Sequence, residues 1–116
     1  MPHHALIHRW DDLALDKVTE MIARKAVAGA RDTMVQTYLK KGALVPVHTH
    51  GAEQMIYVLQ GALRVMVAGQ ALTVREGELL RVPADAPHQT EALDDTFVLT
   101  VSESASPSRP VHPDAR

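Results

Sequence analysis

Two histidines one residue apart, His48 and His50, are the clearest chemical feature of the sequence. Side chains alternate along a β-strand, so both imidazoles project from the same face if this segment is extended. Two imidazoles on one face can bind a single metal ion. His88 is the only other histidine outside the two ends of the chain, and it follows a short apolar run that stops at Pro83. We therefore predict that these three histidines meet at a divalent-metal site.

The elements that must position these histidines are predicted to be strands. Short segments rich in Val, Leu, Ile and Thr alternate with turn residues, and no convincing amphipathic helix is found. Eight or nine such segments at close spacing predict an all-β sandwich or jelly-roll barrel, which holds small-molecule sites near one mouth. The predicted strands outside the histidine segment are 5–10, 17–30, 32–41, 54–59, 62–67, 71–74, 79–82, 88–92 and 96–102.

Composition sets broad limits on function. The 116 residues are 46% apolar but only 3% aromatic, so the core must consist mainly of aliphatic side chains. A formal net charge of −2, with the two signs interspersed, gives no case for nucleic acid or membrane partners. The absence of cysteine excludes disulfides and thiolate zinc sites. With no signal-peptide pattern and no run of membrane-spanning length, we expect a cytoplasmic protein.

The chain is predicted to form one domain over residues 1–104, with a flexible, proline-rich tail over residues 105–116. The early strand at 5–10 is of the kind that completes a sheet of its own chain or of a partner. The strands within residues 1–41 are therefore candidates for a dimer interface.

The first histidine segment resembles the first sequence motif of the cupin superfamily. Five residues separate Gly42 from His48, and three separate His50 from Gln54. Six further residues lead to Gly61. Gln54 occupies the position at which that motif usually has an acid.

The second cupin motif is matched by Gly77, Pro83 and His88 at the family's spacings. Asp85 stands where the family has a glycine, and Ala92 stands where it has an asparagine. Two motifs in the right order are jointly specific, so the resemblance implies the double-stranded β-helix, or jelly-roll barrel, of the RmlC-like cupins. It also implies a homodimer, because cupins of this size commonly pair through exposed sheets.

Within the superfamily, the glutamine at the acid position makes this chain similar to the small cupins related to the pectin-degradation protein KdgF. KdgF acts on unsaturated uronate sugars. The metal ligands implied by that resemblance are His48, His50, Gln54 and His88. The group also has an aspartate, a phenylalanine and an arginine associated with its last strand. Those positions are Thr100, Ser102 and Ser106 here, so the resemblance supports the metal site better than the uronate chemistry.

A set of three neutral imidazoles and one amide leaves the charge of a divalent ion uncompensated. Such a site is a strong Lewis acid, which favours isomerase or lyase chemistry on a small oxygenated substrate, such as a sugar or keto acid. The ligand types suit Zn, Fe, Ni, Mn or Cu. Two other functions stay open: a non-catalytic binding or sensor protein, and an oxygen-dependent iron enzyme such as a dioxygenase.

Candidates for a general base are few. Tyr38, Glu53 and Glu103 are the weak candidates, besides a metal-bound hydroxide. Glu53 could also replace Gln54 as a ligand through a shift of one residue, but neighbours on a strand point to opposite faces, which disfavours this alternative.

Overall fold

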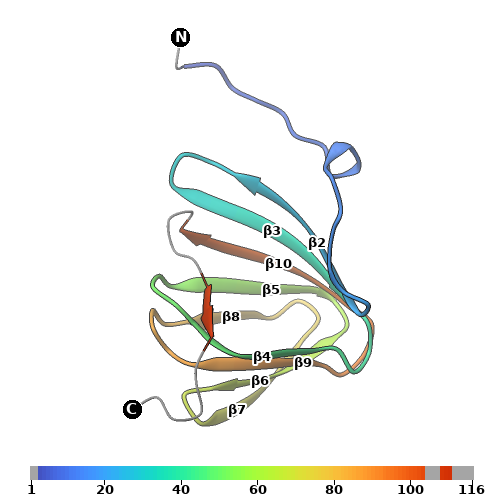
Figure 1. Ribbon diagram of the computed structural model, residues 1–116, viewed down its shortest axis with the longest axis vertical. Helices are drawn as coiled ribbons and strands as arrows, with labels where there is room; N and C mark the ends of the chain where they lie inside the picture. The colour runs from blue at the N-terminus through green and yellow to red at the C-terminus, as the bar shows by residue number, and fades with distance from the viewer. Residues whose placement is uncertain (1–2, 104–107, 111–116) are drawn as a thin grey trace.

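Two antiparallel β-sheets stack on each other in a jelly roll (Figure 1). Figure 1 shows the computed structural model, which describes residues 3–103 and 108–110. The larger sheet contains, in spatial order, β1 (Asp16–Thr19), β2 (Ile22–Ala28), β3 (Asp32–Leu39), β10 (Thr96–Glu103), β5 (Gln54–Gln60) and β8 (Leu79–Val82). The smaller sheet contains β11 (Ser108–Pro110), β4 (Leu44–His50), β9 (His88–Ala92), β6 (Ala62–Val67) and β7 (Gln70–Arg75). The predicted all-β jelly-roll fold is confirmed.

The core lies between the two sheets because alternate residues of each strand point inward. On β5, Ile56 and Val58 are buried, whereas Met55 and Tyr57 are exposed on the outer side. Val58 and Val82 of the larger sheet and Leu63 and Val65 of the smaller sheet are almost completely inaccessible to solvent. Aliphatic side chains therefore fill the interior, as the low aromatic content predicts.

A tight junction fixes the turn between β5 and β6 to the start of β10. Gly61 has φ of +92°, a conformation that favours glycine. The hydroxyl of the fully buried Thr96 accepts a hydrogen bond from the Ala62 amide at 3.2 Å and lies 2.8 Å from the Asp94 carbonyl oxygen. This junction orients β10, whose inner face forms part of the cavity described below.

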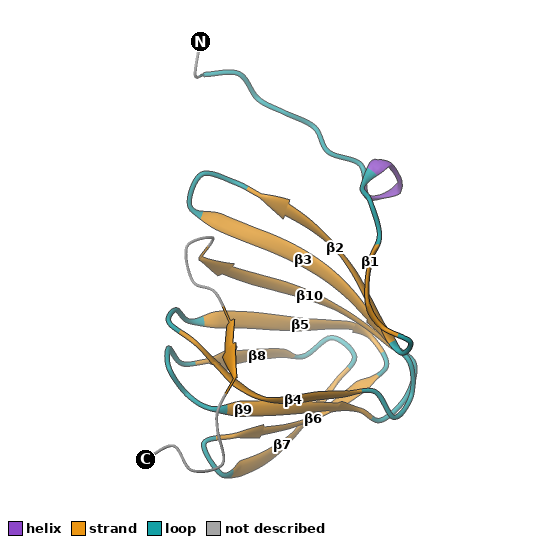
Figure 2. Cartoon of the chain, in the orientation of Figure 1, coloured by secondary structure: helices purple, strands orange, loops and turns teal. Residues whose placement is uncertain are grey.

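The N-terminal segment differs from the predicted strand at residues 5–10. Leu6 and Ile7 are 78% and 85% exposed, and the first part of the segment extends away from both sheets (Figure 2), whereas Trp10 accepts a hydrogen bond from Lys25 of β2. It leads into a short 3-10 helix, Trp10–Asp12, and the first strand is β1. The strand propensity of residues 5–10 was not sufficient to form a strand, because no neighbouring strand of the described chain pairs with this segment.

The end of the chain also differs from expectation. Residues 108–110 of the predicted flexible tail form β11, which pairs with β4, while the other positions of that tail lie outside the described residues. Among the residues described, no helix is long and apolar enough to cross a membrane.

Candidate metal centre

Three histidines converge where β4 ends and β9 begins. The antiparallel register places His48 directly opposite His88, and His50 follows on the same face of β4. The ring centroid of His48 lies 4.7 Å from that of His50 and 4.2 Å from that of His88. One ring nitrogen from each histidine lies within 4.8 Å of the others. The structure therefore brings together the three histidines that the sequence singled out.

Hydrogen bonds to the backbone set the tautomers of two of these rings. Nδ1 of His48 lies 2.8 Å from the Pro46 carbonyl oxygen, and Nδ1 of His88 lies 3.0 Å from that of Ala86. A carbonyl oxygen can only accept, so Nδ1 must carry the proton in both rings. The lone pair of each Nε2 is then available to a metal. Metal-binding histidines are commonly oriented in this way, by a hydrogen bond from the ring nitrogen that does not bind the metal.

The electrostatics of the cluster also suit a cation. Burial, together with the smaller effects of the neighbouring His48 and His88, lowers the pKa of His50 from 6.5 to about 4. Burial likewise lowers the pKa of His88, although its hydrogen bond to Ala86 opposes this shift. Both rings are therefore neutral at neutral pH, and their lone pairs are not blocked by protons.

Gln54, the fourth candidate ligand, lies on the larger sheet, opposite the histidines. It is the first residue of β5, is partly buried, and lines the same cavity as the three histidines. Its amide oxygen is a neutral oxygen donor, so the four side chains together would offer three nitrogens and one oxygen. That donor set fits a divalent ion of the first transition series or zinc.

The cavity that contains this cluster lies between the two sheets and has a volume of about 480 Å³. Its walls are mainly aliphatic, with Ile56 and Val98 from the larger sheet and Leu63 from the smaller one. Thr100 and Ser102 of β10, which replace the aspartate and phenylalanine of the KdgF-related cupins, also line it. A volume of this size suits a small organic molecule.

The family model described as a cupin domain matches residues 34–113, which is more than half of the chain and includes the three histidines and Gln54. The chain belongs to the cupin family. This result confirms the resemblance first seen in the spacing of the histidines and glycines. No curated protein matches this cupin.

Several solved structures share the fold of this cupin. An RmlC-like cupin from Shewanella frigidimarina has a TM-score of 0.80 at 19% identity, covering 88% of this chain and 93% of its own. KdgF from Halomonas sp. has a TM-score of 0.79 at 24% identity, covering 96% and 98%. The polyketide cyclase RemF from Streptomyces resistomycificus has a TM-score of 0.77 at 21% identity, covering 94% and 86%. At such identities these likenesses establish the fold alone.

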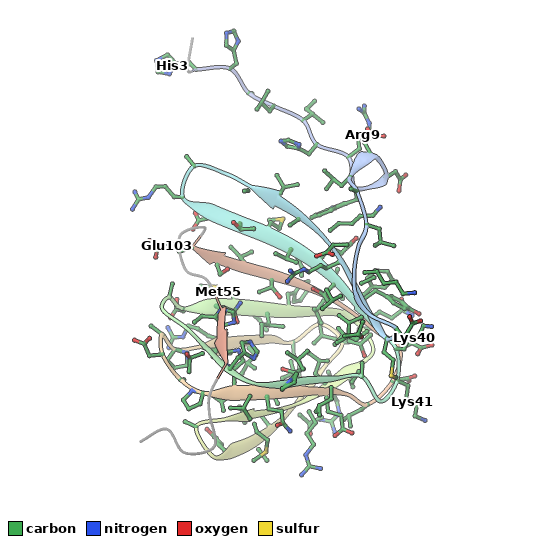
Figure 3. All side chains as sticks on the ribbon, viewed as in Figure 1. His3, Arg9, Lys40, Lys41, Met55 and Glu103 are labelled. Atoms are coloured by element: carbon green, nitrogen blue, oxygen red, sulfur yellow. The ribbon has the colours of Figure 1, made fainter. Side chains whose placement is uncertain are left out.

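The weak candidates for a general base do not line the cavity of this cupin. Tyr38 lies on the outer side of β3, where its ring contacts Phe97 edge-on with centroids 4.8 Å apart. The Glu53 carboxylate lies 3.6 Å from Arg81 Nε, on the other side of β5 from Gln54. Glu103 is exposed at the end of β10 (Figure 3). Strand alternation explains two of these positions, because Tyr38 and Glu53 are offset by one residue from inward-facing neighbours.

Sequence reasoning missed one residue of the cavity wall, Arg24 on β2. A usable signal was present in the alternation of that strand. Ile22 is buried, so Arg24, two residues later, had to face the same side. The prediction of a single strand over residues 17–30, where the structure has β1 and β2, obscured this alternation.

Proposed function

We propose that this cupin binds one divalent metal ion through His48, His50, His88 and Gln54 and is an enzyme acting on a small oxygenated substrate. The observation that carries the proposal is the convergence of three imidazoles in the wall of a largely aliphatic cavity, two of them held by backbone hydrogen bonds in the tautomer that suits metal binding. The bound ion would supply Lewis acid chemistry by polarising an oxygen of the substrate. Isomerisation or elimination next to a carbonyl is the reaction type that this chemistry favours.

The side chains of the cavity have separate tasks in this proposal. The backbone carbonyls of Pro46 and Ala86 hold two histidine rings in orientation. The aliphatic walls offer few polar groups, so electrostatic interactions between the site and a bound substrate are stronger than in water. The hydroxyls of Thr100 and Ser102 can donate hydrogen bonds to substrate oxygens.

A second candidate function is non-catalytic binding or sensing of a small molecule. One observation favours it: among the described residues that line the cavity there is no carboxylate, phenol or lysine. A proton abstracted from a substrate therefore has no obvious side-chain acceptor once the histidines bind a metal.

Turnover by metal-loaded protein separates the two candidates. Protein purified without a nickel column and loaded in turn with Zn, Fe, Ni, Mn or Cu is expected to convert at least one member of a panel of ketoses, uronates and β-keto compounds. Activity should vanish on chelation and return with metal. Ligand binding without any turnover would overturn the enzyme proposal in favour of the binding protein, and oxygen uptake by the iron form would replace it with a dioxygenase.

We also infer a homodimer formed through the outer face of the larger sheet. Met55 and Tyr57 of β5 are exposed there next to Leu79 of β8, which is 59% exposed. Leu99 of β10 lies opposite Tyr57 on the same side. Exposed apolar residues gathered on one sheet face are typical of an association surface.

Light scattering tests this assembly. The purified protein is expected to have twice the chain mass of 12.7 kDa. Leu79→Arg should convert it to a single chain, because a buried guanidinium without a partner opposes association. Leu93→Arg, at a comparably exposed leucine in the turn before β10, should leave the dimer intact. A monomeric starting protein, or equal effects of the two substitutions, would contradict the inference.

A further inference from the structure

A single guanidinium lines the mainly aliphatic cavity. Arg24 is the only arginine, lysine, aspartate or glutamate among the described residues that line it. It lies on β2, opposite Thr37 of β3, which in turn lies opposite Val98 of β10. All three side chains belong to the inner side of the larger sheet, so Arg24 extends the same wall that carries Gln54.

One neighbour orients this guanidinium without exhausting its donors. Asp16 of β1 lies directly opposite Arg24, and Arg24 Nε donates to its carboxylate at 3.1 Å. A guanidinium has five N–H donors, so four remain on the two terminal amino groups. These have no acceptor among the described residues. The pair is about half exposed, at 52% for Arg24 and 62% for Asp16, so it remains open to a ligand.

Arg24 and Gln54, the candidate metal ligand on the same sheet, are far apart. β2 is separated from β5 by β3 and β10, and neighbouring strands lie about 4.8 Å apart, which puts the two strands roughly 14 Å from each other. Arg24 is also level with Val58 rather than with Gln54. A ligand that contacts both ends of the cavity must therefore be elongated. Its middle part would lie against aliphatic residues such as Val35, Ile56 and Val98.

We propose that the cavity binds an elongated organic acid, with an oxygen donor at the histidine end, an apolar middle and a carboxylate held by Arg24. This inference rests on the proposed function, because it names the substrate class of that same site. Arginine recognises carboxylates through paired hydrogen bonds from its terminal amino groups. A carboxylate fits better than a phosphate, because Asp16 already offsets much of the positive charge and would repel a dianion.

Linear dicarboxylates are suitable probes. Calorimetry should show that sebacate, with ten carbons, binds the zinc-loaded protein more tightly than malonate, with three. Sebacate should also bind at least about tenfold more tightly than its monomethyl ester, which lacks one carboxylate. In Arg24→Gln protein this preference over the ester should disappear. Arg64→Gln, at an exposed arginine of β6 outside the cavity, should retain it.

The same titrations in metal-free protein separate this inference from the metal proposal. If metal binds but Arg24→Gln leaves the preference for sebacate over its ester unchanged, the carboxylate site is wrong and the metal site stands. If no metal binds but the preference depends on Arg24, the metal proposal fails and the carboxylate site stands. Tighter binding of 8-phosphonooctanoate than of sebacate would overturn the assignment of a carboxylate.

Discussion

Replacing His50 by alanine is expected to lower the affinity of the protein for zinc by more than about 100-fold, because one of three imidazole ligands is lost. His50 is the most informative of the three histidines. The rings of His48 and His88 bond to backbone carbonyls, whereas the His50 ring has no hydrogen-bond partner among the described residues. Its removal should therefore affect metal binding far more than folding. Zinc content after dialysis against a competing chelator gives the affinity.

A matched control is available in the same chain. His8 is exposed in the N-terminal segment, and His8→Ala should leave zinc binding at the level of the unaltered protein. Both variants should keep the far-ultraviolet spectrum of a β-protein. Stoichiometric zinc in His50→Ala protein under these conditions would show that the histidine cluster is not the metal site.

Substitution of Gly61 by alanine is expected to reduce the free energy of unfolding by about 3 kcal/mol or more. A methyl group at this position would lie only 2.5 Å from the Asp95 carbonyl oxygen and 2.5 Å from the Thr96 hydroxyl. One of these contacts is with backbone that other strands hold in place, so little relief is possible. The positive φ of Gly61 adds the ordinary cost of a left-handed conformation for alanine.

Gly69 allows the two causes to be separated. It has a similar φ of +85°, but a methyl group there would meet no atom within 4 Å. Gly69→Ala should therefore cost only about 1 kcal/mol, which is the conformational part. Urea unfolding of both variants measures the difference. Equal destabilisation would mean that the β5–β6 turn is not sterically tied to β10.

Local spacing was sufficient to predict much of the fold and the grouping of the histidines. His48 and His50 share a face because strand alternation requires it, and Gly77, Pro83 and His88 have the spacing of the second cupin motif. Glycine positions marked turns correctly because positive φ values favour this residue type, as at Gly61. Such features depend on a few neighbouring residues, so the sequence alone carries them.

Features that depend on distant segments were not predictable in this way. The strand propensity of residues 5–10 had no effect, because strand formation requires a partner strand in space. The pairing of β11 with β4 escaped prediction for the opposite reason, since a proline-rich segment gained a partner. Arg24 was missed because its role depends on how far β2 extends the inner wall beyond β3.

Arg24 and the three histidines lie on parts of the fold that tolerate substitution to different degrees. The histidines lie on β4 and β9, which are interior strands of the smaller sheet, and His88 is buried. The inward positions of β2 after Ile22 are exposed, and only the four-residue β1 lies beyond this strand. Substitutions at such exposed positions usually change stability little. Under the proposed function, evolution can therefore change which end group of a ligand β2 recognises while the metal ligands on β4 and β9 stay the same.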